Sequence, residues 1–183
     1  MIKLVLNSNG TNSLIRSHNS FKDLGFVDMS MIIKENIRQG TKIHLISDNP
    51  KPQPHRGEYY LLYMQEYSIV FLFYLDIKGT LRIVHSGDIE NAVSAIYRYV
   101  STDTDIVVLK SDSKRAYRVA KETNEGFKII DAVYKNKSSQ KISQVYMNFF
   151  EAINFAVACH KKDKYNTYSV ISPKNTVMFM VKG

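Results

Sequence analysis

The sequence predicts an α+β domain with a mixed, mostly antiparallel central sheet, flanking helices, and a C-terminal helix and hairpin. Three observations predict this class: three apolar runs in mid-chain separated by short turns, helical spacing of apolar residues around them, and two final apolar runs joined by a turn. Of the 183 residues, 44% are hydrophobic and 23% are charged. This composition is ordinary for a globular domain and excludes the collagen-like, low-complexity and disulfide-scaffold classes.

Residues 1–56 are the N-terminal part of this predicted domain. The first apolar run ends at the turn-forming Asn7-Ser8-Asn9-Gly10. Three of the four prolines fall between Asp48 and Gly57, so we expect an extended loop there, because proline lacks the N–H that helices and inner strands need. The expected elements are a strand over residues 2–6, helices over residues 13–24 and 30–39, and a strand over residues 41–46.

Residues 57–134 are the predicted core, in which three antiparallel strands precede a helix, a strand, a second helix and a last strand. Either Ser86 or Asp88 can cap the first helix, and Ser111-Asp-Ser113 can cap the second. The expected ranges are strands at 59–65, 69–75 and 81–84, a helix at 89–100, a strand at 106–109, a helix between Ser113 and Gly126, and a strand at 127–134.

Residues 135–183 are expected to form a polar link, a long amphipathic helix and a closing hairpin. The helix runs from about Ser139 to His160 and has apolar residues at spacings of three and four. The hairpin pairs Tyr168–Ile171 with Thr176–Val181. A chain of this length usually forms one domain, so we expect residues 1–183 to be a single domain.

The chain is basic, with 25 lysines and arginines against 17 acidic residues and a formal net charge of +8. Positive charge attracts polyanions, and nucleic acid is therefore a candidate partner. The predicted helix after Ser113 carries four basic residues suited to gripping phosphates, although a solvated surface helix would show the same pattern. This basic quartet is Lys114, Arg115, Arg118 and Lys121.

The cellular compartment is indicated by what the sequence lacks. A single cysteine, Cys159, excludes an internal disulfide and fits a reducing compartment. The longest apolar run, Ile69–Leu75, is too short to span a membrane, and the N-terminus has no signal-peptide pattern. We expect a cytoplasmic protein with no membrane partner. Richness in Lys, Asn, Ile and Tyr suggests the AT-rich genome of a phage or another mobile element, in which case the virion is a second expected location.

Motifs that carry chemistry are sparse. The five histidines occur singly, without the paired spacing of metal ligands, so we expect no metal site. The Gly-x-Ser-x-Gly, Walker and dinucleotide-binding glycine patterns are all absent. Motifs alone therefore assign no catalytic residue.

One stretch has a more specific pattern. Ser111 to Phe127 follows a predicted buried strand and contains Ala116 and the pair Gly126-Phe127. Together with the three antiparallel strands and the helix before it, this pattern resembles the core of the GNAT superfamily of N-acetyltransferases over residues 57–134. The resemblance implies a GNAT-like fold and acetyl-CoA as cofactor, with its pyrophosphate on backbone N–H groups at a helix N-terminus.

The resemblance also implies site residues. The family's cofactor loop corresponds to Ser86, Gly87 and Asp88, which would line the pyrophosphate site, and Glu66 and His85 are the candidate bases. This loop has one glycine, no arginine and acidic residues that oppose an anion. The position of the family's catalytic tyrosine falls on alanine or glutamate (Ala120 or Glu122), neither of which can supply a phenol.

These departures favour a GNAT-like protein that has lost or altered acetyl transfer. It would act without a cofactor as a basic binding, accessory or assembly factor, through a protein partner or self-association. One alternative is an acyl-CoA-dependent N-acyltransferase with an atypical cofactor loop, using acetyl-CoA. A second alternative is a nucleic-acid-binding protein. Whether the chain is an enzyme stays open at this point.

Overall fold

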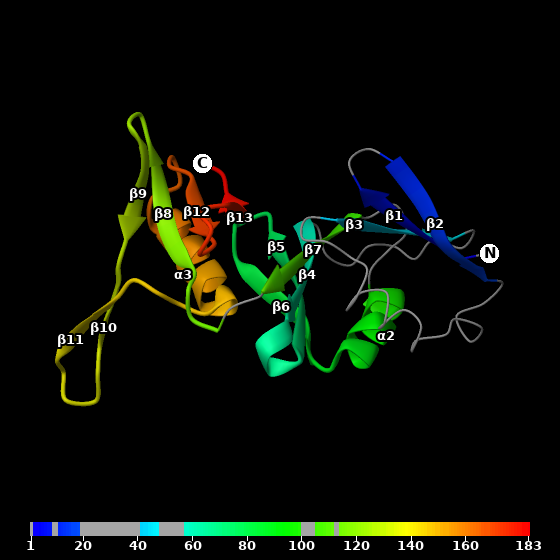
Figure 1. Cartoon of the computed structure of the whole chain (residues 1–183), viewed down its shortest axis with the longest axis horizontal. Coiled ribbons are helices and arrows are strands. Elements are labelled where there is room, and N and C mark those ends of the chain that lie inside the picture. Colours follow the sequence, from blue (N-terminus) through cyan, green and yellow to red (C-terminus); the bar gives the residue numbers. More distant parts are fainter. Residues whose placement is uncertain (1, 9–10, 19–40, 48–56, 100–104, 112–113) are drawn as a thin grey trace. The chain divides into compact units, whose positions relative to one another are not determined.

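The computed structural model describes residues 2–8, 11–18, 41–47, 57–99, 105–111 and 114–183, and it is an α+β structure built mostly from antiparallel strands (Figure 1). The chain divides into two compact units, Met1–Lys110 and Ser111–Gly183, where the sequence led us to expect one domain. We describe each unit by itself. No helix within these described ranges is long and apolar enough to cross a membrane.

The first unit contains a seven-stranded sheet and a helix. Its elements in chain order are β1 (Ile2–Ser8), β2 (Thr11–His18), β3 (Lys42–Ser47), β4 (Gly57–Met64), β5 (Ile69–Asp76), β6 (Leu81–Gly87), α2 (Ile89–Tyr99) and β7 (Asp105–Ser111). The strand order in the sheet is β2-β1-β3-β7-β4-β5-β6. Antiparallel pairing joins β1 to β2 and β3, β3 to β7, and β5 to β4 and β6.

The neighbouring strands β4 and β5 have apolar residues on both faces, and residues 59–64 of β4 and 72–74 of β5 are buried. Aromatic rings stack across this pair, with centroids 5.2 Å apart for Tyr59 on Tyr74 and 5.2 Å for Tyr60 on Phe73. Cross-strand aromatic pairs stabilise an antiparallel sheet beyond the area they bury. The two long apolar runs predicted as strands are therefore confirmed.

Helix α2 begins where the sequence predicted it. The Asp88 side chain caps its first turn, with Oδ1 accepting the Asn91 N–H at 2.8 Å. The helix packs against β5 and β6, and Ile89, Ala92 and Ile96 are buried. The strands expected near residues 41–46, 81–84 and 106–109 are also confirmed, as β3, β6 and β7.

The predicted helix over residues 13–24 is wrong in its first part, which forms β2. This strand pairs antiparallel with β1, with Ser8 opposite Thr11 next to the predicted turn. Pairing with β1 satisfies the backbone groups of β2, and this pairing overrides a weak helical pattern. Two other expectations lie outside the described residues: the helix over residues 30–39 and the proline-rich loop over residues 48–56.

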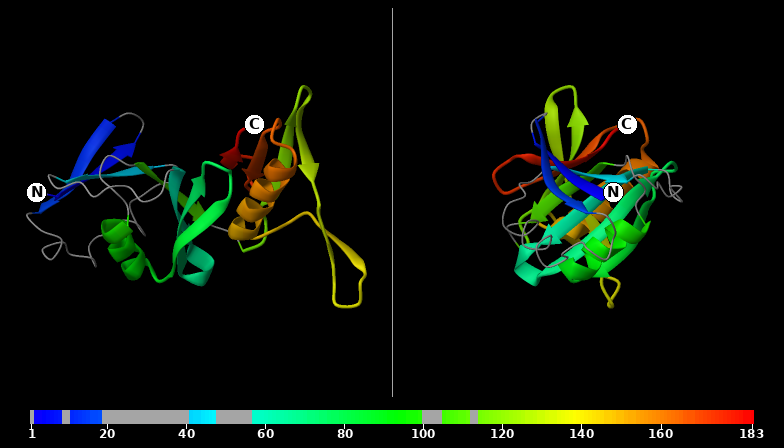
Figure 2. Two further views of the ribbon diagram at one scale, coloured as in Figure 1. Left: turned by 180° about the vertical axis from the view of Figure 1, so that it is seen from behind. Right: turned by 90° about the vertical axis from the view of Figure 1, so that its right-hand side faces the viewer.

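The second unit is a four-stranded antiparallel sheet with a helix packed on it and a separate two-stranded ribbon (Figure 2). Its elements are β8 (Arg118–Thr123), β9 (Gly126–Ile130), β10 (Ala132–Lys135), β11 (Lys141–Gln144), α3 (Phe149–Lys162), β12 (Tyr168–Ile171) and β13 (Val177–Val181). The strand order is β13-β12-β8-β9, and α3 packs against β8, β12 and β13. Strands β10 and β11 form a sheet of their own.

The predicted helix between Ser113 and Gly126 is wrong, because this segment contains strand β8. Val119 and Ala120 are adjacent in sequence and both fully buried, as expected for a strand covered on both faces. Strand β8 pairs with β12 on one side and with β9 on the other. The predicted strand over residues 127–134 is divided between β9 and β10. The segment that carries the GNAT resemblance therefore forms a β-hairpin here.

The long predicted helix is also shorter than expected. Residues 141–144 form β11, and α3 begins only at Phe149. Asn148 and Glu151 form a capping box, in which Asn148 Oδ1 accepts the Glu151 N–H at 2.8 Å and Glu151 Oε2 accepts the Asn148 N–H at 3.1 Å. The closing hairpin predicted after the helix is confirmed as β12 and β13.

Candidate functional site

The three residues predicted to line a cofactor site lie where β6 meets α2. Ser86 and Gly87 end the strand, and Asp88 precedes the helix. The Asp88 carboxylate is occupied by Asn91, accepting from its backbone N–H at 2.8 Å and from its side-chain Nδ2 at 2.8 Å. A pyrophosphate at this helix N-terminus would have to displace a carboxylate that already sits there. The cofactor assignment stays a prediction.

The two candidate bases lie on different elements of the first unit. Glu66 is in the short 3-10 turn Gln65–Tyr67 between β4 and β5, and His85 is on β6, opposite Leu72 of β5. The Nε2 atom of His85 is buried and has no hydrogen-bond partner in the described part of the chain. A catalytic base needs a group that orients it, so this geometry adds nothing to the predicted role.

The basic quartet is not brought together by the structure. Lys114 and Arg115 precede β8, whereas Arg118 and Lys121 lie on it, three residues apart and therefore on opposite faces of the strand. Three of the four side chains contact other parts of the second unit: Arg115 pairs with Glu151 at 3.5 Å, Arg118 donates to Asn175, and Lys121 pairs with Asp163 at 2.8 Å. These side chains do not form the single cationic helix face that was predicted, because the helix itself is absent.

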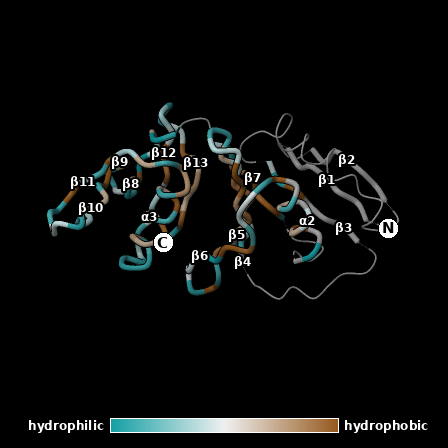
Figure 3. The backbone as a smooth tube through the Cα atoms, turned by 90° about the horizontal axis from the view of Figure 1, so that it is seen from below, coloured by the Kyte–Doolittle hydropathy of each residue, from teal (hydrophilic) through white to brown (hydrophobic). Residues whose placement is uncertain are grey.

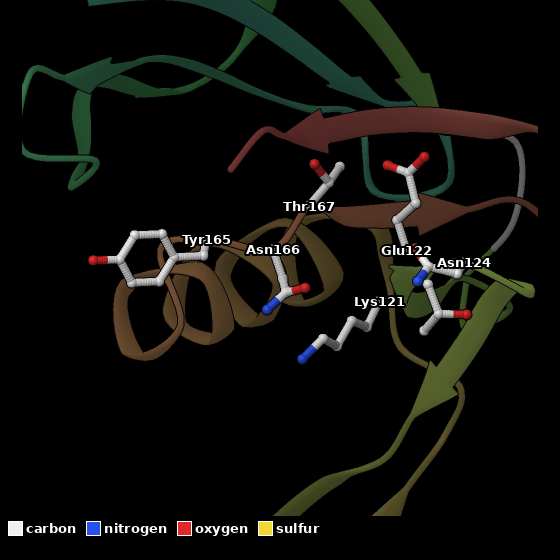
Figure 4. A pocket seen from close by; sticks show the side chains of 7 residues that line it. Lys121, Glu122, Asn124, Tyr165, Asn166 and Thr167 are labelled. Atoms are coloured by element: carbon white, nitrogen blue, oxygen red, sulfur yellow. The ribbon is translucent and has the colours of Figure 1, made fainter.

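An open hollow of about 440 Å³ lies at one end of the second unit's sheet (Figure 4). Lys121 and Asn166 point toward one side of it, whereas Glu122 and Thr167 point toward the other and Tyr165 points away from the group. Its lining residues are Lys121, Glu122, Thr123, Asn124, Tyr165, Asn166 and Thr167. The lining is polar, and its side chains do not converge on one point as catalytic groups do.

Beside this hollow, Asp163 is the centre of a hydrogen-bonded cluster. Its Oδ2 accepts from Lys121 Nζ at 2.8 Å and from the Tyr168 hydroxyl at 3.0 Å, and Asn166 Nδ2 lies 2.8 Å from both of its oxygens. The hydrogen bonds from Lys121 and Asn166 lower the pKa of Asp163 to about 2, and the bond to Asp163 raises the pKa of Lys121. Both groups therefore keep their charges at neutral pH, and the cluster ties the end of α3 to β8 and β12.

The positive charge of the chain is concentrated in the second unit. Residues 111–183 contain 13 of the 25 lysines and arginines but only 6 of the 17 acidic residues, which gives them +7 of the +8 net charge. The first unit is nearly neutral. The sequence alone did not show this division because it gave no reason to place a boundary near residue 110.

The clearest group of unpaired cations lies on the ribbon of β10 and β11, which we call the lysine arm (residues 131–144). Lys135 and Lys141 are directly opposite each other on the two strands, and Lys137 lies in the turn between them. In the described part of the chain no ion pair holds these three side chains, and the nearby Asp131 accepts a hydrogen bond from Ser143 at 2.8 Å. Like charges that face each other across two strands are destabilising.

The apolar residues of the arm are also exposed. Val133 is 62% exposed and Tyr134 is 49% exposed. Figure 3 shows hydrophilic and hydrophobic residues alternating along the arm. Tyr134 is on one face of the ribbon, and Val133 shares the other face with the paired lysines. An exposed ring close to unpaired lysines has the composition of a contact surface for a polyanion.

A second lysine pair has a different environment. Lys121 of β8 lies directly opposite Lys128 of β9, but Lys121 is neutralised by Asp163 at 2.8 Å. Within the described ranges, no carboxylate forms an ion pair with either lysine of the arm pair. Among the described residues of the second unit, the arm is therefore where two lysines face each other across strands without a carboxylate bonded to either of them.

Comparisons of this chain with protein-family models, with curated proteins and with solved structures return no match. No group of three or more histidine, cysteine or acidic residues suited to hold a metal ion occurs in the ranges that the structure describes. The site must therefore be interpreted from its own chemistry, and the GNAT resemblance stays a prediction.

Proposed function

We propose that the chain is a nucleic-acid-binding protein whose second unit supplies the contact surface, with the lysine arm at its centre. The observation that carries this proposal is the cross-strand pair Lys135–Lys141, which has no acidic partner among the residues that the structure describes. A two-stranded ribbon alone is marginally stable in water, and facing like charges lower its stability further. Phosphates would neutralise both lysines and release counterions, so that binding removes a cost the free protein bears.

The basic binding factor expected from the sequence would then have nucleic acid as its ligand. The acyltransferase alternative has less support, because Asp88 occupies the helix N-terminus where the cofactor's pyrophosphate would bind. A nucleic-acid-binding factor works in the cytoplasm or, where a phage encodes it, with the genome that the particle carries. The proposal does not depend on the GNAT resemblance.

The test is a salt titration of nucleic-acid binding, followed by the anisotropy of a fluorescent oligonucleotide. The variant Lys135→Gln/Lys137→Gln/Lys141→Gln removes the three arm charges. Each phosphate contact contributes about 0.7 to the slope of log K against log salt on single strands and about 0.9 on duplex DNA. If all three lysines contact phosphates, their removal therefore makes this slope shallower by about 2 to 3. Binding at low salt is expected to weaken as well.

A matched control removes three exposed lysines elsewhere in the same unit, with Lys164→Gln, Lys174→Gln and Lys182→Gln. This control has the same net charge as the arm variant but leaves the arm intact, so its slope is expected to stay within about 1 of the original. Equal changes in both variants would show that net charge alone drives binding, and the arm would lose its assigned role. No binding by the unaltered chain at low salt would overturn the proposed function.

A further inference from the structure

We infer that the lysine arm selects single-stranded nucleic acid, with bases stacked on the rings of Tyr134 and Tyr146; this inference rests on the proposed function above. Tyr134 is 49% exposed and Tyr146, just after β11, is 57% exposed. Surfaces that bind single strands combine cations along the backbone path with aromatic rings on which bases stack. The arm and the residues next to it contain both.

A third exposed ring has the wrong electrostatic environment. Phe127 is 49% exposed, but it lies directly opposite Glu122, which is also exposed. A carboxylate at that position repels a phosphate backbone. Phe127 is therefore left out of the inferred surface and provides a matched control.

The pairing register places the Tyr134 ring and the paired lysines on different faces of the arm. Tyr134 lies opposite Ile142 on one face, and Lys135 lies opposite Lys141 on the other. The ribbon is two strands wide, with about 5 Å between the strands, so it is narrow enough to enter the major groove of a duplex. The bases of a duplex are paired and stacked on one another and offer no free face to a tyrosine ring, whereas an unpaired strand offers both its phosphates and its base faces.

Three polar side chains of the arm that could read base edges, those of Asn136, Ser143 and Gln144, are already engaged in internal hydrogen bonds. The internal bonds join Asn136 Oδ1 to the N–H groups of Ser138 and Gln140 at 2.9 Å each, Gln144 Nε2 to the Tyr146 carbonyl at 2.9 Å, and Ser143 Oγ to Asp131 at 2.8 Å. Base-edge hydrogen bonds are what give sequence specificity, and stacking tolerates every base. The arm is therefore expected to bind single strands of any sequence.

The experiment compares the full chain with Tyr134→Leu, Tyr146→Leu and the control Phe127→Leu. The probes are labelled single-stranded DNA of two unrelated sequences, the corresponding RNA, and duplex DNA, all at one salt concentration. Each tyrosine replacement is expected to weaken single-strand binding by about 5- to 100-fold, which corresponds to the loss of one stacked base. The control is expected to bind as the original does. Because the chain has no tryptophan, quenching of its tyrosine fluorescence on binding gives a second readout, which each replacement should reduce.

The outcomes separate this inference from the proposed function. Tighter binding of duplex than of single strands, or unchanged binding by both tyrosine variants, would overturn the single-strand inference while the salt dependence of the arm lysines could still hold. A strong preference for one of the two sequences would overturn it as well. Loss of all nucleic-acid binding by the unaltered chain would overturn both. These three rings are exposed, so circular dichroism should show the variants folded as the original is.

Discussion

The stack of Tyr117 on Phe149 offers a direct test of how the second unit is built. Both side chains are fully buried, with ring centroids 4.6 Å apart and planes 8° from parallel. Tyr117 is held there by backbone bonds to Met147, with N···O distances of 3.0 Å and 2.8 Å. A helix between Ser113 and Gly126 would break both of these bonds, because its own turns would use the same backbone groups.

The expected magnitude comes from burial and ring geometry. Truncating a buried aromatic side chain to alanine costs about 3–5 kcal/mol, so Tyr117→Leu and Phe149→Leu, which keep apolar volume, should each cost about 1–3 kcal/mol. Each single variant loses the same interaction, the stacking of the two rings, and this loss is part of both destabilisation energies. The double variant should therefore be less destabilised than the sum of the two by about 0.5–1.5 kcal/mol, the energy of an aromatic pair beyond its buried area.

The assay is urea unfolding of the full chain, followed by far-UV circular dichroism for the original, both single variants and the double variant. Phe149→Leu combined with Leu72→Met, a core change in the first unit, is the control pair and should be additive within about 0.5 kcal/mol. If the coupling energy between Tyr117 and Phe149 is no larger than in that control, the two rings are not stacked. The packing of Tyr117 against the first residue of α3 would then be refuted as well.

Two further predictions concern the ends of α3. Asn148→Ala removes the side chain that caps the helix and should lower the free energy of unfolding by about 1 kcal/mol, while Asn148→Asp should retain the cap; chemical denaturation of both variants measures this. Asp163 has a pKa of about 2 in the folded chain against 3.8 without its partners, so the folded state is stabilised above about pH 4 and loses that stabilisation as the pH falls toward 2. Asp163→Asn should therefore flatten the fall in the urea midpoint between about pH 4 and pH 2, and an equally steep fall in the variant would contradict this role.

The parts of the fold that local sequence determines were predicted well. Strands β4 and β5 are long apolar runs, and α2 has both helical spacing and an Asp88 cap, so each is specified within its own residues. Strand β8 could not be found in this way. The positions of Ala116, Val119, Ala120 and Thr123 also fit a helix, and pairing with β9 and with β12, far along the chain, makes this segment a strand.

The sequence contains a helix-start pattern at the point where α3 begins, but the apolar spacing upstream of it favoured an earlier start. Asn148 followed three residues later by Glu151 is a helix-start pattern. Apolar spacing continues upstream through Ile142 and Val145, and it favoured a longer helix. In the structure, Ile142 lies on β11, where the polar turn at Asn136 pairs it with β10. Periodicity therefore outweighed a cap that would have placed the boundary correctly.

The candidate site is defined by which lysines face each other across two strands. That pairing register cannot be derived from the number of charges in a stretch of sequence. The sequence showed a basic stretch but led us to the quartet beginning at Lys114, whose members mostly have partners inside the second unit. Two lysine pairs face each other across strands in this unit, Lys121 with Lys128 and Lys135 with Lys141. Among the described residues, a carboxylate lies within bonding distance of the first pair only, where Asp163 is 2.8 Å from Lys121. A folded chain that keeps an unneutralised pair on an exposed ribbon bears a cost that hydrophobic burial does not recover there, since the ribbon buries little. That cost is removed when an anion binds, and it is the physical reason to seek the ligand at the arm rather than at the predicted quartet.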